Sequence, residues 1–124
     1  MANETKLGVA PNVGGLICYV PCGVGLVFSI VAVIVEKDNR FVRFHAIQSL
    51  VLHGVLTVFL IGVSLFVTIV SAIVPFFGLL MLPVWLLLSV VTLGACVFMM
   101  MKANNNEEYR LPVIGDMASQ WANQ

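Results

Sequence analysis

The stretch that decides the fold is Glu36-Lys37-Asp38-Asn39-Arg40-Phe41-Val42-Arg43-Phe44-His45-Ala46-Ile47-Gln48. It holds three of the six Lys and Arg residues of the chain, and charge-free sequence flanks it on both sides. No Asp, Glu, Lys or Arg occurs between Leu7 and Val35, and none occurs between Phe44 and Met101. A charged side chain near the centre of a bilayer costs about 2.5–3.5 kcal/mol. The stretch therefore belongs in water or among lipid headgroups, and the flanking runs are free to enter lipid.

The overall composition is that of a membrane protein. The 124 residues are 60% hydrophobic and 10% charged, whereas soluble domains are about 45–50% apolar and about 25% charged. The length predicts one domain over residues 1–124. A net charge of zero leaves no basic footprint for a nucleic acid. Three cysteines, an odd number within apolar runs, favour packing over a disulfide framework or a zinc site.

Three apolar runs are long enough to cross a bilayer as helices. We predict spans over about 13–35, 46–71 and 78–101, because a span needs about 20 residues. The first run could instead be a secretory signal peptide, but its length and the absence of a clear cleavage site favour a retained span. The turn over 75–78 is short and apolar, which predicts that the second and third spans form an antiparallel hairpin.

These features predict an all-α integral membrane protein with three transmembrane helices and an interfacial tail over 102–124. Five of the six positive residues fall in the charged loop or the tail. By the positive-inside rule the loop and the C-terminus should face the cytoplasm of a prokaryotic plasma (inner) membrane, with the N-terminus outside. At least one contact should form between Arg40 or Arg43 and the carboxylates of the tail, Glu107, Glu108 and Asp116, and hold the tail down.

The first and second runs each carry a distinctive helical face. Small residues recur every three or four positions in the first run, which predicts close packing of helices; they are Gly14, Cys18, Cys22, Gly25 and Ser29. Polar residues line one side of the second run, with Gln48 beside them: His45, Ser49, His53, Thr57, Ser64, Thr68 and Ser71. Such a stripe lines a proton, ion or peptide path, or it forms hydrogen bonds between helices. The packing interpretation is the one we favour.

No set of residues suits catalysis. His53 with Ser49 is the only nucleophile–base pair, and it lacks an acid to orient it. His45 and His53 have no matching carboxylate or thiol for a metal. We therefore expect no enzymatic activity and no cofactor. The candidate functional or interaction residues are Arg40, Arg43, His45, Gln48, Ser49, His53 and Asp116.

Three segments resemble a known family: 12–19 (NVGGLICY), 35–50 (VEKDNRFVRFHAIQSL) and 109–116 (YRLPVIGD). They resemble the small three-span membrane proteins, mostly prokaryotic and uncharacterised, that are grouped with the import-channel component of the chloroplast inner envelope. The run Phe41-Val42-Arg43-Phe44-His45-Ala46-Ile47-Gln48-Ser49 is the specific part. The resemblance implies a multi-span helical fold and a link to protein translocation. The chloroplast relatives are typically described with four spans, whereas this chain has three predicted ones.

Three helices cannot enclose a wide pore, so a translocation role would require an oligomer or larger partners. The leading hypothesis is a non-enzymatic subunit or accessory of a membrane complex, related to protein translocation or insertion. Its partners would be the lipid bilayer, other membrane subunits or further copies of itself. One alternative is a small homo-oligomeric channel or transporter lined by the polar stripe. A second alternative is a lipid- or stress-responsive membrane scaffold.

Overall fold

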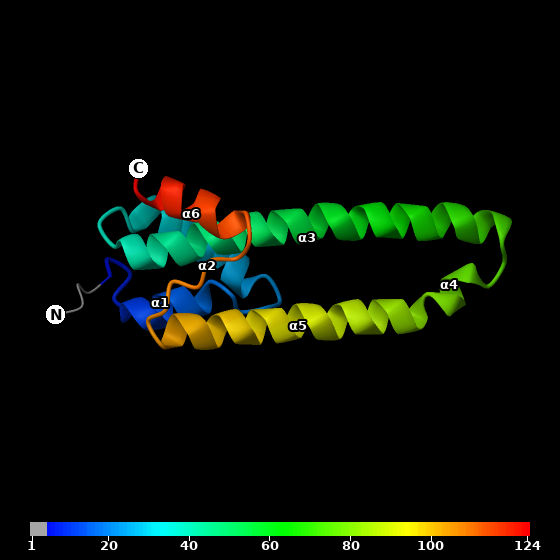
Figure 1. Cartoon of the computed structure of the whole chain (residues 1–124), viewed down its shortest axis with the longest axis horizontal. Helices are drawn as coiled ribbons and strands as arrows, with labels where there is room; N and C mark the ends of the chain where they lie inside the picture. The colour runs from blue at the N-terminus through cyan, green and yellow to red at the C-terminus, as the bar shows by residue number, and fades with distance from the viewer. Residues whose placement is uncertain (1–4) are drawn as a thin grey trace.

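A computed structural model describes residues 5–124, and the described chain is helical, without strands. Two long helices run antiparallel, and three shorter helices, α1, α2 and α6, gather around one end of the pair (Figure 1). We call that end the cap. The elements are α1 (Pro11–Ile17), α2 (Val24–Val35), α3 (Arg40–Ile73), α4 (Phe77–Leu80), α5 (Leu82–Asn104) and α6 (Ile114–Ala122).

The longest helix, α3, belongs to two environments. It begins where the side chain of Asn39 accepts a hydrogen bond from the Val42 amide at 3.2 Å, a typical N-cap. Its first turns, through Ser49, are largely buried in the cap. No residue from Gly54 to Ile73 is buried. These twenty residues are about 30 Å long, which is about the thickness of the hydrocarbon core of a bilayer.

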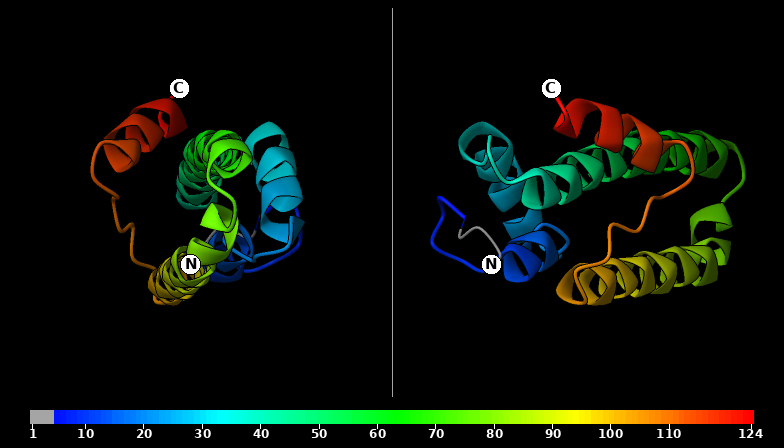
Figure 2. Two further views of the ribbon diagram at one scale, coloured as in Figure 1. Left: turned by 90° about the vertical axis from the view of Figure 1, so that its right-hand side faces the viewer. Right: turned by 60° about the vertical axis from the view of Figure 1, so that its left-hand side comes forward.

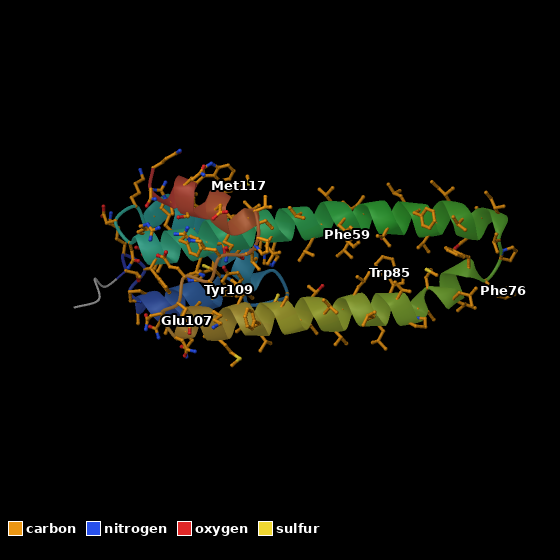
Figure 3. The ribbon with its side chains drawn as sticks, viewed as in Figure 1. Phe59, Phe76, Trp85, Glu107, Tyr109 and Met117 are labelled. Atoms are coloured by element: carbon orange, nitrogen blue, oxygen red, sulfur yellow. The ribbon has the colours of Figure 1, made fainter. Side chains whose placement is uncertain are left out.

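The second long element is α5, preceded by the single turn of α4. The break between them falls at Met81, and Pro83 lies in the first turn of α5, where its missing amide is tolerated. Both Arg40–Ile73 and Phe77–Asn104 are long and apolar enough to cross a membrane. Trp85 lies on the side of α5 that faces α3 (Figure 3) and, with Leu60, helps to line an apolar cavity of about 380 Å³.

The predicted single span over 13–35 is wrong. The chain leaves α1 at Ile17 and reverses through Pro21, Cys22 and Gly23 before α2 begins. Cys22 and Gly23 have positive φ angles of 66° and 82°, and Pro21 has no amide to continue a helix. The reversal brings Gly25 so close to the preceding backbone that an added Cβ would lie 2.5 Å from the carbonyl oxygens of Cys18 and Val20. Within the small-residue face, Gly25 therefore serves a tight turn, whereas Gly14 lies against Val42 of α3, where an added Cβ would be 3.2 Å from the valine side chain.

Because of this reversal, the N-terminal arm returns to the charged loop. The buried carboxylate of Glu36 accepts a hydrogen bond from the Leu7 amide at 2.8 Å. Lys6 pairs with Asp38 at 2.7 Å, and this contact lowers the pKa of the Asp38 carboxyl. The two ends of the first apolar run thus lie at the same end of the molecule. The described start of the chain and its C-terminus thus lie at the same end of the two long helices, whereas the prediction placed the two termini on opposite sides of the membrane.

The tail completes the cap. Residues 105–113, which we call the strap, cross from the end of α5 to α3, and α6 then lies along the first turns of α3 (Figures 1 and 2). One core cluster joins the residues that follow α1 with α2, α3 and α5 around Tyr19, Ala46 and Met99. A second joins α3 and α6 through Phe44, Ile47, Ala118 and Ala122. The cap therefore holds the ends of both long helices together.

Candidate functional site

The polar residues predicted on α3 converge on a buried network inside the cap. The side chains of His45, Gln48 and Ser49 are fully buried. They meet the residues that follow α1 on one side and the strap on the other. A fourth member, Tyr19, is also fully buried. We call these four residues the cap network.

Gln48 fastens the strap to α3. Its Nε2 donates to the backbone oxygen of Tyr109 and to the hydroxyl of Tyr19, both at 3.0 Å. Its Oε1 accepts from the Leu111 amide at 3.1 Å. One side-chain amide therefore forms hydrogen bonds with a backbone carbonyl and a backbone amide of the strap, the two groups that a neighbouring strand would pair in a sheet. Because these backbone groups are partly buried, losing their partner would leave them unpaired.

The same bonds bear on the tautomer of His45. The Tyr19 hydroxyl accepts from Gln48 and lies 3.1 Å from Nδ1 of His45, and the assignment that pairs the most polar groups has this hydroxyl donate to Nδ1. The neutral imidazole then carries its proton on Nε2, which is buried and has no hydrogen-bond partner among the described residues. Aromatic rings of Phe41, Phe44 and Tyr19 approach His45 edge-on, with ring centroids 4.6–5.7 Å away.

This enclosure suppresses ionisation of His45, which lies in the first turns of α3, before the segment that has the length of a bilayer core. Burial lowers the pKa of His45 to about 4, and the backbone of Glu107 opposes that effect. An imidazolium is disfavoured in such a site because desolvation penalises the charged form. His45 is therefore neutral at pH 7 and acts as a hydrogen-bond acceptor.

Ser49 and His53 follow His45 along the polar side of α3, farther from the start of the helix. The Ser49 hydroxyl donates to the backbone oxygen of Cys18, which anchors the turn after α1 to α3. His53 is half-buried, and its Nδ1 donates to the Ser49 carbonyl at 2.7 Å. The partner of His53 is thus its own helix, one turn back, rather than a neighbouring helix.

The three charged candidates behave differently from one another. Arg40 binds the tail through Glu108 at 2.7 Å, Asn123 at 2.6 Å and Ser119 at 3.3 Å. The predicted contact between the loop and the tail is therefore present, and Arg40 makes it. Arg43 has a buried Nε without a hydrogen-bond partner among residues 5–124. Asp116 lies outside the network, exposed, with Arg110 3.9 Å away.

Beyond the cap, the polar stripe on α3 does not line a path through the protein. Thr57, Ser64 and Thr68 are exposed, and Thr68 donates to the Ser64 carbonyl of its own helix at 2.8 Å. On α5, Ser89 does the same with Trp85 at 2.9 Å. Hydroxyls satisfied in this way tolerate lipid, because Ser and Thr can bond the carbonyl four residues earlier. The stripe therefore divides into a buried part that joins elements and an exposed part that does not.

Sequence reasoning missed Tyr19, the residue that links His45 to Gln48. It also missed the buried Glu36 and the strap backbone at Tyr109 and Leu111. Tyr19 is the only large polar side chain between Val13 and Val35, and an isolated phenol in an apolar run is a signal that could have been used. No group of three or more His, Cys, Asp or Glu side chains is arranged to hold a metal ion in the described part of the chain. Chemically, the arrangement is suited to holding elements together.

Comparison with known proteins identifies relatives over almost the whole chain. Residues 3–118 match the model of the MamF/MmsF family, described as the magnetosome magnetite crystal formation protein family. A UPF0132 membrane protein of Methanocaldococcus jannaschii is 36% identical over 122 residues, covering 96% of this chain and 94% of the relative. One from Archaeoglobus fulgidus is 33% identical, covering 88% and 92%.

A second Methanocaldococcus jannaschii protein with the same description is 31% identical, covering 93% of this chain and 72% of the relative. No solved structure matches the chain. These relatives are described as membrane proteins, and none is described as a component of a chloroplast translocon. The expected link to the chloroplast import channel is therefore not supported. The similarity therefore supports a membrane location, in agreement with the two long apolar helices.

Proposed function

The chain belongs to the MamF/MmsF family of magnetosome magnetite crystal formation proteins, and from this premise we propose that it is a non-enzymatic subunit or accessory of a membrane complex. The family description refers to magnetite, whereas the archaeal relatives are described only as membrane proteins. A membrane location is the property common to the relatives and this fold. The proposal therefore rests on the fold and on the surfaces that it leaves open.

The observation that carries the proposal is the contrast between the cap and the long helices. The cap residues bury their polar groups on one another. The apolar stretches of the two long helices are almost entirely unburied within the chain. Their facing sides leave an apolar cavity lined by Leu60, Trp85 and Leu88. The exposed sides of both helices are therefore available to contact lipid and neighbouring membrane helices.

The fold also supports an orientation for this subunit. All six Lys and Arg residues lie in the cap or in segments that join it, and the turn between α3 and α4 has none. Positive charge is retained on the cytoplasmic side of membranes. We propose that the cap lies toward the cytoplasmic side of the membrane, with both described ends of the chain on that side.

The channel alternative is less well supported by the geometry. The buried half of the polar stripe is occupied by hydrogen bonds within the cap, and Thr68 in the exposed half bonds to its own helix. A conducting path would need these groups free to face water. Flux of protons or ions through liposomes that contain the purified protein would favour the alternative over a subunit role.

Crosslinking in native membranes, followed by native electrophoresis in mild detergent, tests the subunit role. We expect a crosslinked ladder containing other membrane proteins, identified by mass spectrometry, and reduced capture when a bulky polar residue replaces Val58 on the exposed side of α3 (72% exposed). Lys37→Gln, which changes an exposed residue in the loop before α3 rather than on its apolar surface, is the control. A ladder made only of this chain, or only monomer, would contradict the proposal.

A further inference from the structure

The outward face of α2 remains uncovered by the fold. Its aliphatic side chains Val27 and Ile34 are 63% and 64% exposed, and Val24, Ile30 and Val31 accompany them. The opposite face, with Gly25, Ser29 and Ala32, is buried in the cap. The described chain offers nothing that covers the outward side. Isolated apolar side chains on a surface need no explanation, but a continuous aliphatic face does.

The exposed sides of α2 and α6 differ in polarity. Both helices flank the same stretch of α3: α2 ends just before α3 begins, and α6 packs on Phe44 and Ile47. Viewed along the long axis, α2 and α6 lie on opposite sides of α3 (Figure 2, left). Yet the α6 side exposes an ion pair, Asp116 with Arg110, whose side chains are 72% and 50% exposed.

In a bilayer, the medium depends on depth. Two sides of one protein at the same depth meet the same medium, either water and headgroups or acyl chains. The aliphatic face of α2 and the ionised face of α6 lie at the same level of α3. They can both be accommodated only if the molecule tilts or if protein covers one of the two faces. The charge-free part of α3, Phe44–Ile73, is about 45 Å long, against about 30 Å for the hydrocarbon core. A helix of excess length commonly tilts.

We propose that the hairpin of α1 and α2 is inserted into one leaflet, so that lipid acyl chains cover the outward face of α2 while α6 lies at the headgroup level on the other side. The twelve residues of α2 are about 18 Å long, close to one leaflet. The uncharged turn at Cys22 and Gly23 is the deep end. The charged residues Glu36, Lys37 and Asp38 are the shallow end, so α2 follows the polarity gradient of a leaflet.

The shape and chemistry of the face fit an acyl chain better than a protein. An open groove of about 630 Å³ runs along it, lined by Cys22, Gly23, Val24, Val27, Phe28 and Val31. Apart from one thiol, the lining side chains are hydrocarbon. Protein interfaces usually combine an apolar centre with a polar, hydrogen-bonding rim, and this face has no polar side chain between Val24 and Val35 other than the buried Ser29. This placement goes beyond the subunit role proposed above and does not depend on it.

Site-directed spin labelling of the full chain in phosphatidylcholine–phosphatidylglycerol liposomes tests the placement. Single cysteines are introduced at Val27, Ile34, Asp116 and Gln120 in a Cys22→Ser background, since Cys18 and Cys96 are buried. Val58→Cys, on the exposed side of α3, is the reference for a site in lipid. Collision rates with oxygen report lipid, and collision rates with a water-soluble nickel chelate report water.

We expect oxygen to dominate at Val27 and Ile34, with Val27 the deeper site, and the nickel chelate to dominate at Asp116 and Gln120. Low collision rates with both reagents at Val27, at every protein-to-lipid ratio, would show that protein covers α2 and would overturn the proposal in favour of a second copy on this face. Nickel-dominated collisions at Val27 would place α2 in water and would also overturn it. Failure to find partner proteins leaves these results unaffected, so the two proposals fail separately.

Discussion

His45 combines complete burial with a ring nitrogen, Nε2, that makes no hydrogen bond within the described structure, while the backbone of Glu107 favours the charged form of the ring. Its other nitrogen accepts from Tyr19, which in turn accepts from Gln48. Adding a proton at Nδ1 would turn that acceptor into a donor and leave the Tyr19 hydroxyl proton without a partner. The cap network therefore disfavours protonation of His45, and this has a measurable consequence for stability.

We predict that the protein loses stability as the pH falls from about 6.5 to about 4. Above the unfolded-state pKa of His45, 6.5, both states are neutral and the histidine contributes no pH dependence. Between 6.5 and about 4, the unfolded chain binds a proton that the folded chain excludes, which favours unfolding. The loss reaches at most about 3 kcal/mol. Thermal unfolding in detergent from pH 7.5 to 4 measures it.

His45→Gln is the control, because glutamine does not titrate and occupies a similar volume. Its melting temperature should change less between pH 6.5 and 4 than that of the wild type. Identical pH profiles for the two proteins would refute the role of His45. Lys6 and Asp38 are exposed and lie outside the network, so they do not enter this comparison.

The strap and α6 are held in place mainly by their contacts with α3. Gln48 binds the backbone of the strap, and Phe44 with Ile47 packs on α6. Arg40 adds a charged contact to Glu108 and bonds to two residues of α6 or its end. The tail is thus positioned by the same two turns of α3 that build the cap network.

We predict that Arg40→Ala makes the tail more susceptible to limited proteolysis in detergent. The substitution removes three bonds to residues 108–123. Exposed ion pairs contribute only about 0–1 kcal/mol, so global thermal stability should change little. Arg43→Ala is the matched control, since Arg43 makes no hydrogen bond or ion pair with the tail in the described structure. Equal cleavage of the two variants would contradict this assignment.

The whole molecule has two long helices rather than three crossing ones, and this changes where its ends lie. We predict that Lys6→Cys and Gln124→Cys, each in a Cys22→Ser background, react with a membrane-impermeant thiol reagent from the same side. Val74→Cys, next to the turn between α3 and α4, should react from the opposite side. Intact and inverted membrane vesicles provide the two sides, and Lys37→Cys reports the position of the cap. Labelling of Lys6→Cys and Gln124→Cys from opposite sides would restore the three-span arrangement.

The sequence by itself determined the all-helical class, the membrane location, the two long apolar helices and the charged stretch as the start of α3. These follow from hydrophobicity and charge, which act locally and are additive along the chain. It also placed His45, Gln48, Ser49 and His53 on one side of a helix, because helical periodicity requires this.

Only the tertiary structure decided the course of residues 13–35 and the partners of the polar row. Pro21 and Gly23 are compatible with a continuous membrane helix as well as with a reversal, and local sequence does not distinguish the two. The reversal depends on distant contacts: Glu36 with Leu7, Ser49 with the Cys18 carbonyl, and Tyr19 between His45 and Gln48. Such bonds join residues 26 to 31 positions apart. Periodicity says which face of a helix is polar, but not which element will pack against it.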